Sequence, residues 1–167
     1  MKIAICSDSH DNLVNISKFL HYCNMNDVET VLHCGDWCAP STLKYFRENF
    51  TGLLYGVYGN VHDEDKVMRK IAEEQKIIIK EDKLELEIDG INMMITHYPE
   101  TAQKTALINK YHMIFYGHDH KPWKEVISKT YIINPGTLAG MFYKSTFALY
   151  DTQSRKLDLV LLDELKQ

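Results

Sequence analysis

The first two-thirds of the chain alternates short apolar runs with segments whose apolar residues recur at helical spacing. Apolar runs at 2–7, 29–34 and 53–58 have the length of strands, and the segments at 12–25, 40–50 and 63–74 have the spacing of helices. Three strand–helix units in succession predict a parallel sheet covered by helices.

The rest of the chain is rich in predicted strands. Residues 84–89 alternate apolar and acidic side chains, which is typical of a half-exposed strand, and Asp89-Gly90 then predicts a hairpin into a strand at 91–96. A helix is expected at 101–109. Further strands are expected at 77–80, 113–116, 123–128, 131–133, 147–150 and 156–162. We expect the strands from 123 onward to complete a second, largely antiparallel set, which gives an α/β fold with two sheets packed face to face and helices outside.

No linker, repeat or low-complexity stretch interrupts this pattern, so a single domain over residues 1–167 is the simplest organisation. The formal net charge of −4 lacks the basic surplus that binding a nucleic-acid backbone requires, which argues against a nucleic-acid polymer as ligand. No apolar run approaches the length of a membrane span, and the first residues lack the apolar core of a signal peptide. We therefore expect no membrane association and a cytoplasmic location.

Polar residues follow five of the expected strands at the point where each strand ends. Asp8 and His10 follow the first strand, Asp36 the second, Asn60 the third, His97 the strand at 91–96, and His118 and His120 the strand at 113–116. Ligand sites of α/β sheets form at the carboxyl ends of strands. Each fragment alone is an ordinary turn or helix cap, but their ordered combination indicates one site.

The chemistry of this set is that of a metal centre. Two carboxylates, one amide oxygen and four imidazoles are more donors than one tetrahedral zinc ion needs, and they suit two ions that share a carboxylate. Mixed imidazole and carboxylate ligation favours Mn, Fe, Zn or Ni over Ca or Mg. Two such ions clamp the attacking and leaving oxygens of a displacement at phosphorus and lower the pKa of water.

The ordered motifs resemble the calcineurin-like metallophosphoesterase superfamily. They read Asp8-Ser9-His10, Gly35-Asp36, Gly59-Asn60, His97 and Gly117-His118-Asp119-His120, and the short chain with Asn134-Pro135-Gly136 is most similar to small single-domain YfcE-type phosphodiesterases. The resemblance implies a four-layer αββα sandwich of two mixed β-sheets flanked by helices. It also implies two divalent metal ions, with Mn²⁺ as the usual activator and Ni²⁺, Fe²⁺ or Zn²⁺ as alternatives.

The same resemblance implies a role for each motif residue. Asp8, His10, Asp36 and His120 would hold one ion, and Asp36, Asn60, His97 and His118 the other, with Asp36 as the bridge. Asp36, Asn60 and His97 are also the expected catalytic residues. Small members of the family often self-associate, so a dimer or tetramer is expected as well.

One position departs from the family pattern. Larger members have a histidine directly after the motif asparagine, which is thought to protonate the leaving group, whereas this chain has Val61 followed by His62. His62 is therefore a candidate general acid; its alternative interpretation is an exposed loop residue. Trp37, Tyr98 and Trp123 flank the motifs and either stack on a nucleobase or pack at the rim of the site.

The expected function is metal-dependent hydrolysis of a small phosphodiester. One alternative is a non-catalytic scaffold, as in the retromer subunit with this fold, but such proteins tend to lose metal ligands and all seven positions are intact here. The other alternative is a phosphomonoesterase, which needs cations to neutralise the additional charge of a monoester. The three arginines of the chain, Arg47, Arg69 and Arg155, lie outside the motifs, which favours a diester.

Overall fold

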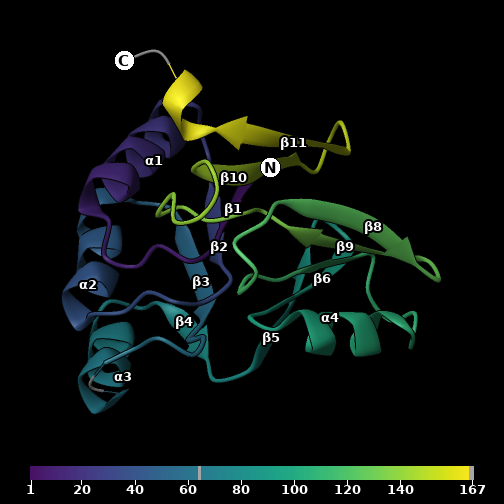
Figure 1. Ribbon diagram of the computed structural model, residues 1–167, viewed down its shortest axis with the longest axis horizontal. Helices are drawn as coiled ribbons and strands as arrows, with labels where there is room; N and C mark the ends of the chain where they lie inside the picture. Colours follow the sequence, from purple (N-terminus) through teal and green to yellow (C-terminus); the bar gives the residue numbers. More distant parts are fainter. Residues whose placement is uncertain (64, 166–167) are drawn as a thin grey trace.

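The computed structural model describes residues 1–63 and 65–165, and its first sheet contains the strand–helix units of the amino-terminal half (Figure 1). The sheet has the order β11–β10–β1–β2–β3–β4. Its strands are β1 (Lys2–Cys6), β2 (Thr30–His33), β3 (Leu53–Val57), β4 (Ile78–Lys80), β10 (Thr146–Asp151) and β11 (Lys156–Leu161). Strands β1 to β3 pair in parallel, as expected, and β4 extends this parallel set by a strand that the sequence pattern does not assign to it. Strands β10 and β11 add an antiparallel ribbon.

The second sheet has the order β5–β6–β7–β9–β8. Its strands are β5 (Lys83–Ile88), β6 (Ile91–Thr96), β7 (Met113–Phe115), β8 (Trp123–Ile127) and β9 (Thr130–Asn134). The expectation of a largely antiparallel set is wrong for its centre, because β6, β7 and β9 are parallel. It is also wrong for β10 and β11, which join the first sheet. Alternation of apolar and polar residues along a strand specifies which face of that strand is buried. It does not specify which other strand pairs with it or in which direction, because the partner can lie far away in the sequence.

Helices cover the outer face of each sheet, which gives the four-layer αββα sandwich (Figure 1). The helices are α1 (Leu13–Met25), α2 (Pro40–Asn49) and α3 (Asp65–Glu74) on the first sheet and α4 (Pro99–Ala106) on the second, with a short 3-10 helix, η1 (Leu162–Glu164), near the carboxyl end. In β1, Ala4 and Cys6 pack toward the helices while Ile3 and Ile5 pack between the sheets. Because both faces of β1 are buried, it appears in the sequence as a continuous apolar run.

Loops at the carboxyl ends of the parallel strands are fixed by local capping. Asn12, the residue before α1, accepts a hydrogen bond from Asn15 N at 3.2 Å and donates one to Ala139 O at 2.9 Å. Asn12 is therefore the N-cap of α1.

None of the helices within 1–63 and 65–165 combines the length and apolarity that crossing a membrane requires.

Candidate metal centre

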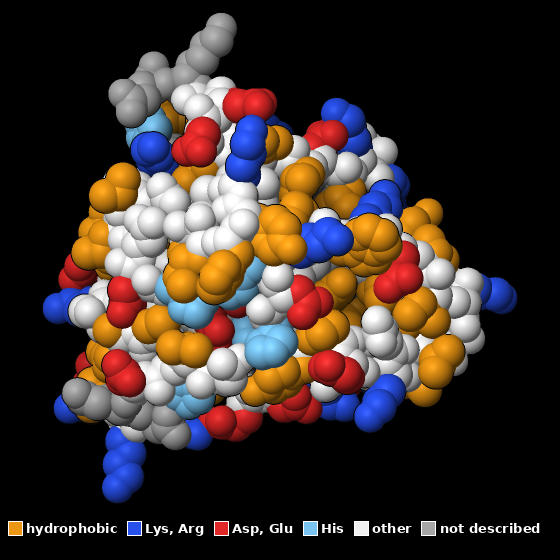
Figure 2. Space-filling view, in the orientation of Figure 1, with side chains coloured by type: hydrophobic (Ala, Val, Ile, Leu, Met, Phe, Trp, Pro, Cys, Tyr) orange, Lys and Arg blue, Asp and Glu red, His pale blue; other side chains and the backbone are white. Residues whose placement is uncertain are grey.

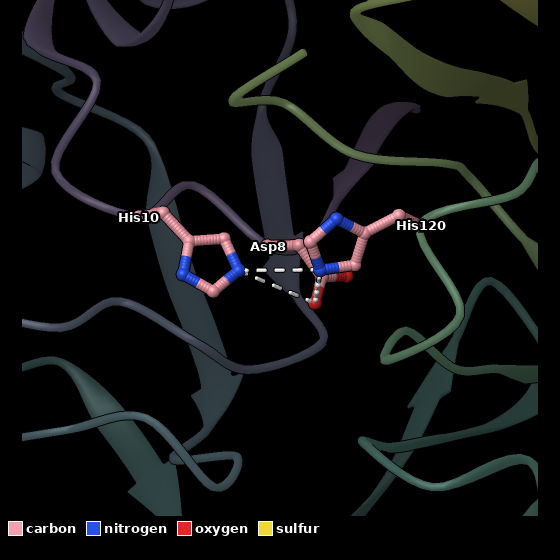
Figure 3. A group of neighbouring side chains, drawn as sticks. All are labelled: Asp8, His10 and His120. Atoms are coloured by element: carbon pink, nitrogen blue, oxygen red, sulfur yellow. Dashed lines mark hydrogen bonds and ion pairs between the residues drawn. The ribbon is translucent and has the colours of Figure 1, made fainter. Parts of the chain in front are cut away.

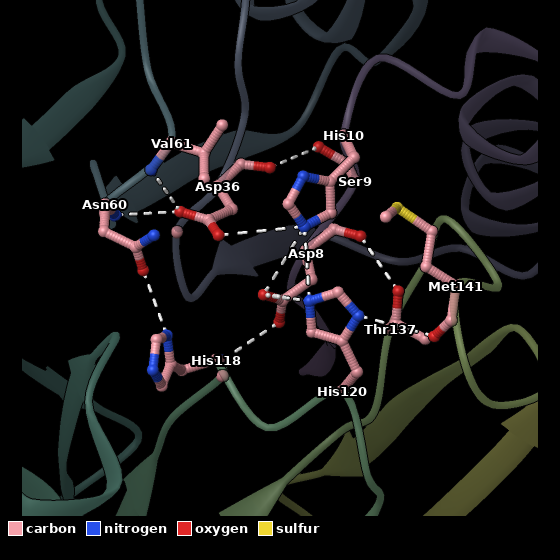
Figure 4. Close-up of polar contacts among 12 residues, drawn as sticks. Asp8, Ser9, His10, Asp36, Asn60, Val61, His118, His120, Thr137 and Met141 are labelled. Carbon is pink, nitrogen blue, oxygen red and sulfur yellow. Dashed lines mark hydrogen bonds and ion pairs between the residues drawn. The ribbon is translucent and has the colours of Figure 1, made fainter.

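Six of the seven side chains selected from the sequence converge where strands of both sheets end (Figure 4), and His97 joins them through its contacts with Asp36 and Asn60. Asp8 and His10 follow β1, Asp36 follows β2, Asn60 follows β3, His97 follows β6, and His118 and His120 follow β7. In the space-filling view, histidine side chains gather near the centre of one face and hydrophobic side chains surround them (Figure 2).

Asp8, His10 and His120 form a first group of potential metal ligands (Figure 3). The His10 Nε2 and His120 Nε2 atoms are 3.3 Å apart, and Asp8 Oδ1 lies 3.2 Å from His120 Nε2 and 3.9 Å from His10 Nε2. Three donor atoms from two chain segments, the loop after β1 and the loop after β7, therefore face one point, which is the arrangement that a shared cation requires.

A second group lies beside the first and contains Asp36, Asn60, His97 and His118. His97 Nε2 is 3.4 Å from Asp36 Oδ1 and 2.9 Å from Asn60 Oδ1. Asn60 Oδ1 is also 3.0 Å from His118 Nδ1. The amide oxygen and two imidazoles thus converge as closely as the donors of the first group.

Asp36 lies between the two groups. Its Oδ2 is 3.7 Å from His10 Nε2 in the first group, and its Oδ1 is 3.4 Å from His97 Nε2 in the second. The backbone N–H groups of Asn60 and Val61 both donate to Oδ1 at 2.8 Å, which fixes the carboxylate. Each oxygen therefore faces a different group, which places this one carboxylate within reach of both.

Outer partners orient three of the imidazoles. His97 Nδ1 contacts Cys34 O at 2.8 Å and His120 Nδ1 contacts Met141 O at 3.4 Å. A carbonyl only accepts, so Nδ1 carries the hydrogen and Nε2 presents its lone pair to the centre. His10 Nδ1 contacts Cys38 Sγ at 3.5 Å. Sequence reasoning missed these partners, and no motif marks Met141, which reaches His120 through the fold alone.

The backbone of the site is held in a conformation that L-residues rarely adopt. Positive φ angles occur at five of the seven candidate ligands: Asp8 (52°), His10 (39°), Asp36 (61°), His118 (72°) and His120 (57°). Such residues cost about 1–3 kcal/mol each and cluster at functional sites. Backbone hydrogen bonds between the loops, such as Asp8 N to Gly35 O at 3.0 Å, hold them in place.

Two motif glycines are needed for this close packing. A Cβ on Gly59, which has a φ of 89°, would collide with the Asp36 carboxylate. A Cβ on Gly117 would collide with the side chains of Ser7 and Asp8. These glycines are therefore positions where only a residue without Cβ allows the ligand loops to approach this closely.

The charges of the site favour a bound cation. Asp8 and Asp36 are buried, and the ion pairs that the structure describes for them are with histidines. In addition, Asp8 Oδ1 receives no hydrogen bond from the described residues. Burial of two carboxylates without a lysine or arginine partner is unfavourable unless another positive charge is present. The donor set and this charge deficit both fit divalent metal ions.

The pKa directions reflect the same pairing. Burial raises the pKa of Asp36, but the hydrogen bond and charge of His97 and the N–H groups of Val61 and Asn60 outweigh it, so this pKa is lowered. Burial lowers the pKa of His97, and the contact with Asp36 more than compensates, so that pKa is raised. Contact with Asp8 raises the pKa of His120 against the effect of burial.

Other aromatic candidates have different environments. His33 is fully buried, and its ring centre lies 3.6 Å from that of Trp37. Its ring nitrogens contact Ser9 Oγ at 3.0 Å and accept from Gly35 N at 3.2 Å, so it is a core histidine whose polar atoms are paired. Trp37 is buried and donates to Val57 O, and a stacking role for Trp37 is therefore wrong. Tyr98 packs edge-on against His97 and His118, whereas Trp123 is 51% exposed.

His62 and the Asn134-Pro135-Gly136 turn flank the centre. His62 is half-buried, its backbone pairs with Cys38, and its ring lies 5.3 Å from that of Tyr58. Asn134 donates to Gly117 O at 3.1 Å and accepts from Gly136 N at 2.8 Å. Asn134 thus ties the turn at Gly136 to the loop that carries His118 and His120.

Comparison with known proteins defines the class. Residues 1–155 match the model of the calcineurin-like phosphoesterase superfamily domain, and the chain belongs to this superfamily. It is 35% identical to phosphodiesterase MJ0936 of Methanocaldococcus jannaschii over 98% of this chain and 100% of that protein. A solved archaeal phosphodiesterase superposes with a TM-score of 0.88 at 31% identity, covering 96% of this chain and 99% of its own. YfcE, a phosphoesterase from E. coli, shares the fold with a TM-score of 0.70 at 15% identity, covering 97% of this chain and 100% of its own.

Proposed function

We propose that this protein is a metal-dependent phosphodiesterase that hydrolyses a small phosphodiester. Membership of the phosphoesterase superfamily and similarity along the whole length of an archaeal phosphodiesterase support the reaction class. The observation that carries the two-metal form of the proposal is the position of Asp36, whose two oxygens face two different groups of donors.

Two groups of residues would hold the two ions. Asp8, His10, Asp36 and His120 would bind one, and Asp36, Asn60, His97 and His118 the other. Divalent ions bound there neutralise phosphate charge and lower the pKa of water. Mn²⁺ is the proposed ion, and Ni²⁺, Fe²⁺ and Zn²⁺ are alternatives that the same donors accept.

The chain's own residues contribute by fixing positions before substrate arrives. Two backbone N–H groups hold the Asp36 carboxylate, and Cys34 O holds His97 with Nε2 facing inward. Asn60 Oδ1 lies between His97 and His118. Because these groups are already oriented, little reorganisation accompanies the displacement at phosphorus.

A diester fits the charge of the surroundings better than a monoester. Arg47 donates to Gly52 O, Arg69 pairs with Glu81, and Arg155 lies in the turn between β10 and β11. All three arginines are therefore engaged or placed away from the metal centre. A monoester carries one more negative charge than a diester, and no guanidinium is available to neutralise it.

The test is hydrolysis of bis-p-nitrophenyl phosphate by metal-stripped protein with and without Mn²⁺. We expect Mn²⁺-dependent cleavage, weak cleavage of the monoester p-nitrophenyl phosphate, and a loss of at least about 100-fold in Asp36→Asn, because both ions lose a shared ligand. Asp163→Asn, an exposed substitution in η1, is the matched control and should retain full activity.

Three outcomes would contradict parts of the proposal. Folded protein that cleaves no diester with Mn²⁺, Ni²⁺, Fe²⁺ or Zn²⁺ would refute the phosphodiesterase and favour the scaffold. Preference for the monoester would favour a phosphomonoesterase. Calorimetric titration that finds one ion per chain would refute the two-metal centre.

A further inference from the structure

A cavity of about 340 Å³ opens beside the metal centre, between α4 and the start of β8. Its lining includes Pro99, Asp119, Lys121, Trp123, Glu125 and Tyr143. They come from α4, the His118–His120 loop, β8 and the loop after Gly140. The cavity contains none of the seven candidate ligands.

Three of its lining residues are neighbours of residues in the metal centre. Asp119 stands between the ligands His118 and His120, and Pro99 follows Tyr98, whose ring lies 5.4 Å from that of His118. The 141–143 loop connects the two places, because Met141 O contacts His120 Nδ1 and Tyr143 lines the cavity. A group attached to a phosphate at the metal centre is therefore within reach of the cavity.

Two large aromatic side chains line this cavity while remaining open to solvent. Trp123 is 51% exposed and Tyr143 is 46% exposed. Lys121 Nζ lies 5.5 Å from the centre of the Trp123 ring, which places a cation at the same wall. Exposed aromatic faces beside a phosphate site are suited to stacking on a planar group.

The polar groups of the cavity distinguish between planar ligands. Asp119 and Glu125 supply carboxylate acceptors, and Lys121 supplies a donor. A hydrocarbon ring offers these groups no hydrogen bonds, whereas a nucleobase offers both N–H donors and ring acceptors. The polar groups of the lining can therefore pair with the edge of a base while the aromatic rings stack on its face.

We propose that this cavity binds the nucleobase of a nucleoside phosphodiester whose phosphate lies at the metal centre. The inference rests on the proposed function and narrows its substrate class. Water forms a new bond to phosphorus, the bond from phosphorus to the second substituent breaks, and the departing oxygen takes up the proton. The products are a nucleoside monophosphate, retained by its base, and an alcohol.

The test holds the leaving group constant and varies the other substituent. Methyl p-nitrophenyl phosphate, bis-p-nitrophenyl phosphate and thymidine 5′-p-nitrophenyl phosphate all release p-nitrophenolate. We expect the thymidine ester to have the lowest KM. Trp123→Ala should raise the KM for the thymidine ester about tenfold, with little change for the methyl ester. Trp123→Phe should raise the KM for the thymidine ester much less, because phenylalanine keeps a stacking face.

Tyr131→Ala is the matched control. Tyr131 is 44% exposed in the same sheet, but it lies near the start of β9, whereas Trp123 pairs with Asn134 at the end of that strand. The substitution should change the KM of none of the esters. A second measurement, quenching of Trp123 fluorescence by thymidine in metal-free protein, detects base binding without catalysis and should be absent in Trp123→Phe.

The outcomes separate this inference from the proposed function. Cleavage of all three esters with equal KM, unchanged by Trp123→Ala, would overturn the nucleobase site and leave the phosphodiesterase intact. An equal effect of Trp123→Ala on the thymidine and bis-p-nitrophenyl esters would show that any aryl group is accepted, which also overturns it. If no ester is cleaved, the proposed function fails, and absence of quenching would then refute the base site independently.

Discussion

Val61 stands where larger members of the superfamily have a histidine, and its side chain is 40% exposed at the edge of the metal centre. Its backbone N–H donates to Asp36 Oδ1 at 2.8 Å. The backbone contribution of this position is therefore independent of its side chain. A valine cannot transfer a proton, so cleavage here should depend on leaving groups that depart without protonation, unless His62 or water serves instead.

Val61→His should add a proton donor without disturbing the Asp36 hydrogen bond. We expect kcat/KM for a diester with an alkyl leaving group to rise about tenfold or more, with little change for p-nitrophenyl esters. Comparison of the two esters across pH is the measurement. His62→Asn is the companion variant, and a selective loss on the alkyl ester would identify His62 as the existing acid. Equal effects of Val61→His on both esters would contradict a proton-donor role at this position.

At the scale of elements, hydrogen bonds hold together the loops that follow different strands. Asn134, at the end of β9, is buried and joins the β7 loop at Gly117 to its own turn at Gly136. Thr137 then donates to Asp8 O at 3.1 Å, after β1. The turn therefore connects ligand loops that follow strands of different sheets, and metal affinity depends on it although it contributes no ligand.

Asn134→Ala should lower the free energy of unfolding by about 1–3 kcal/mol, because it removes the side-chain partner of the buried Gly136 N–H and one of the two hydrogen bonds to Gly117 O, which keeps the one from Asp119 N. It should also weaken Mn²⁺ binding by about tenfold. Urea unfolding and calorimetric titration measure the two effects. Asn24→Ala, which removes an exposed side-chain hydrogen bond to Asn49 O, is the control and should stay within about 0.5 kcal/mol. Unchanged metal affinity in Asn134→Ala would mean that the turn does not hold the ligand loops.

At the scale of the whole molecule, the metal centre joins the two sheets. Asp8, Asp36 and Asn60 follow strands of the first sheet, whereas His97, His118 and His120 follow strands of the second. Bound ions would therefore stabilise the sandwich as a whole, by about 2.7 kcal/mol per site at a free concentration 100 times the Kd. Chelation should lower Tm accordingly.

Raising the pH above about 6.5 should lower the stability of metal-free protein and raise the affinity for Mn²⁺. In metal-free protein, the raised pKa values of His97 and His120 contribute stability below their usual pKa of 6.5, and this contribution is lost as pH rises through the raised values. The lowered pKa of Asp36 contributes above its usual 3.8 and is lost as pH falls through the lowered value. Metal-free protein should therefore be most stable between about pH 4 and 6.5.

Metal binding requires neutral imidazoles, so affinity for Mn²⁺ should rise with pH, by up to about tenfold per unit for each histidine that must lose a proton. The increase in Tm caused by Mn²⁺ should consequently grow from pH 6 to pH 8. Thermal unfolding at several pH values, with Mn²⁺ and with chelator, tests both signs. A Tm increase that is the same at pH 6 and pH 8 would refute the competition between protons and metal.

The sequence by itself determined the elements and the chemical composition of the site. Apolar runs and helical spacing identify strands and helices because burial imposes those periods locally, and Asp, Asn and His at successive strand ends indicate one site because parallel strands end together. The tertiary structure alone decided that β10 and β11 join the first sheet, that Trp37 is buried, and that Met141 O orients His120. These depend on pairing and contact between distant segments, for which a local pattern carries no information.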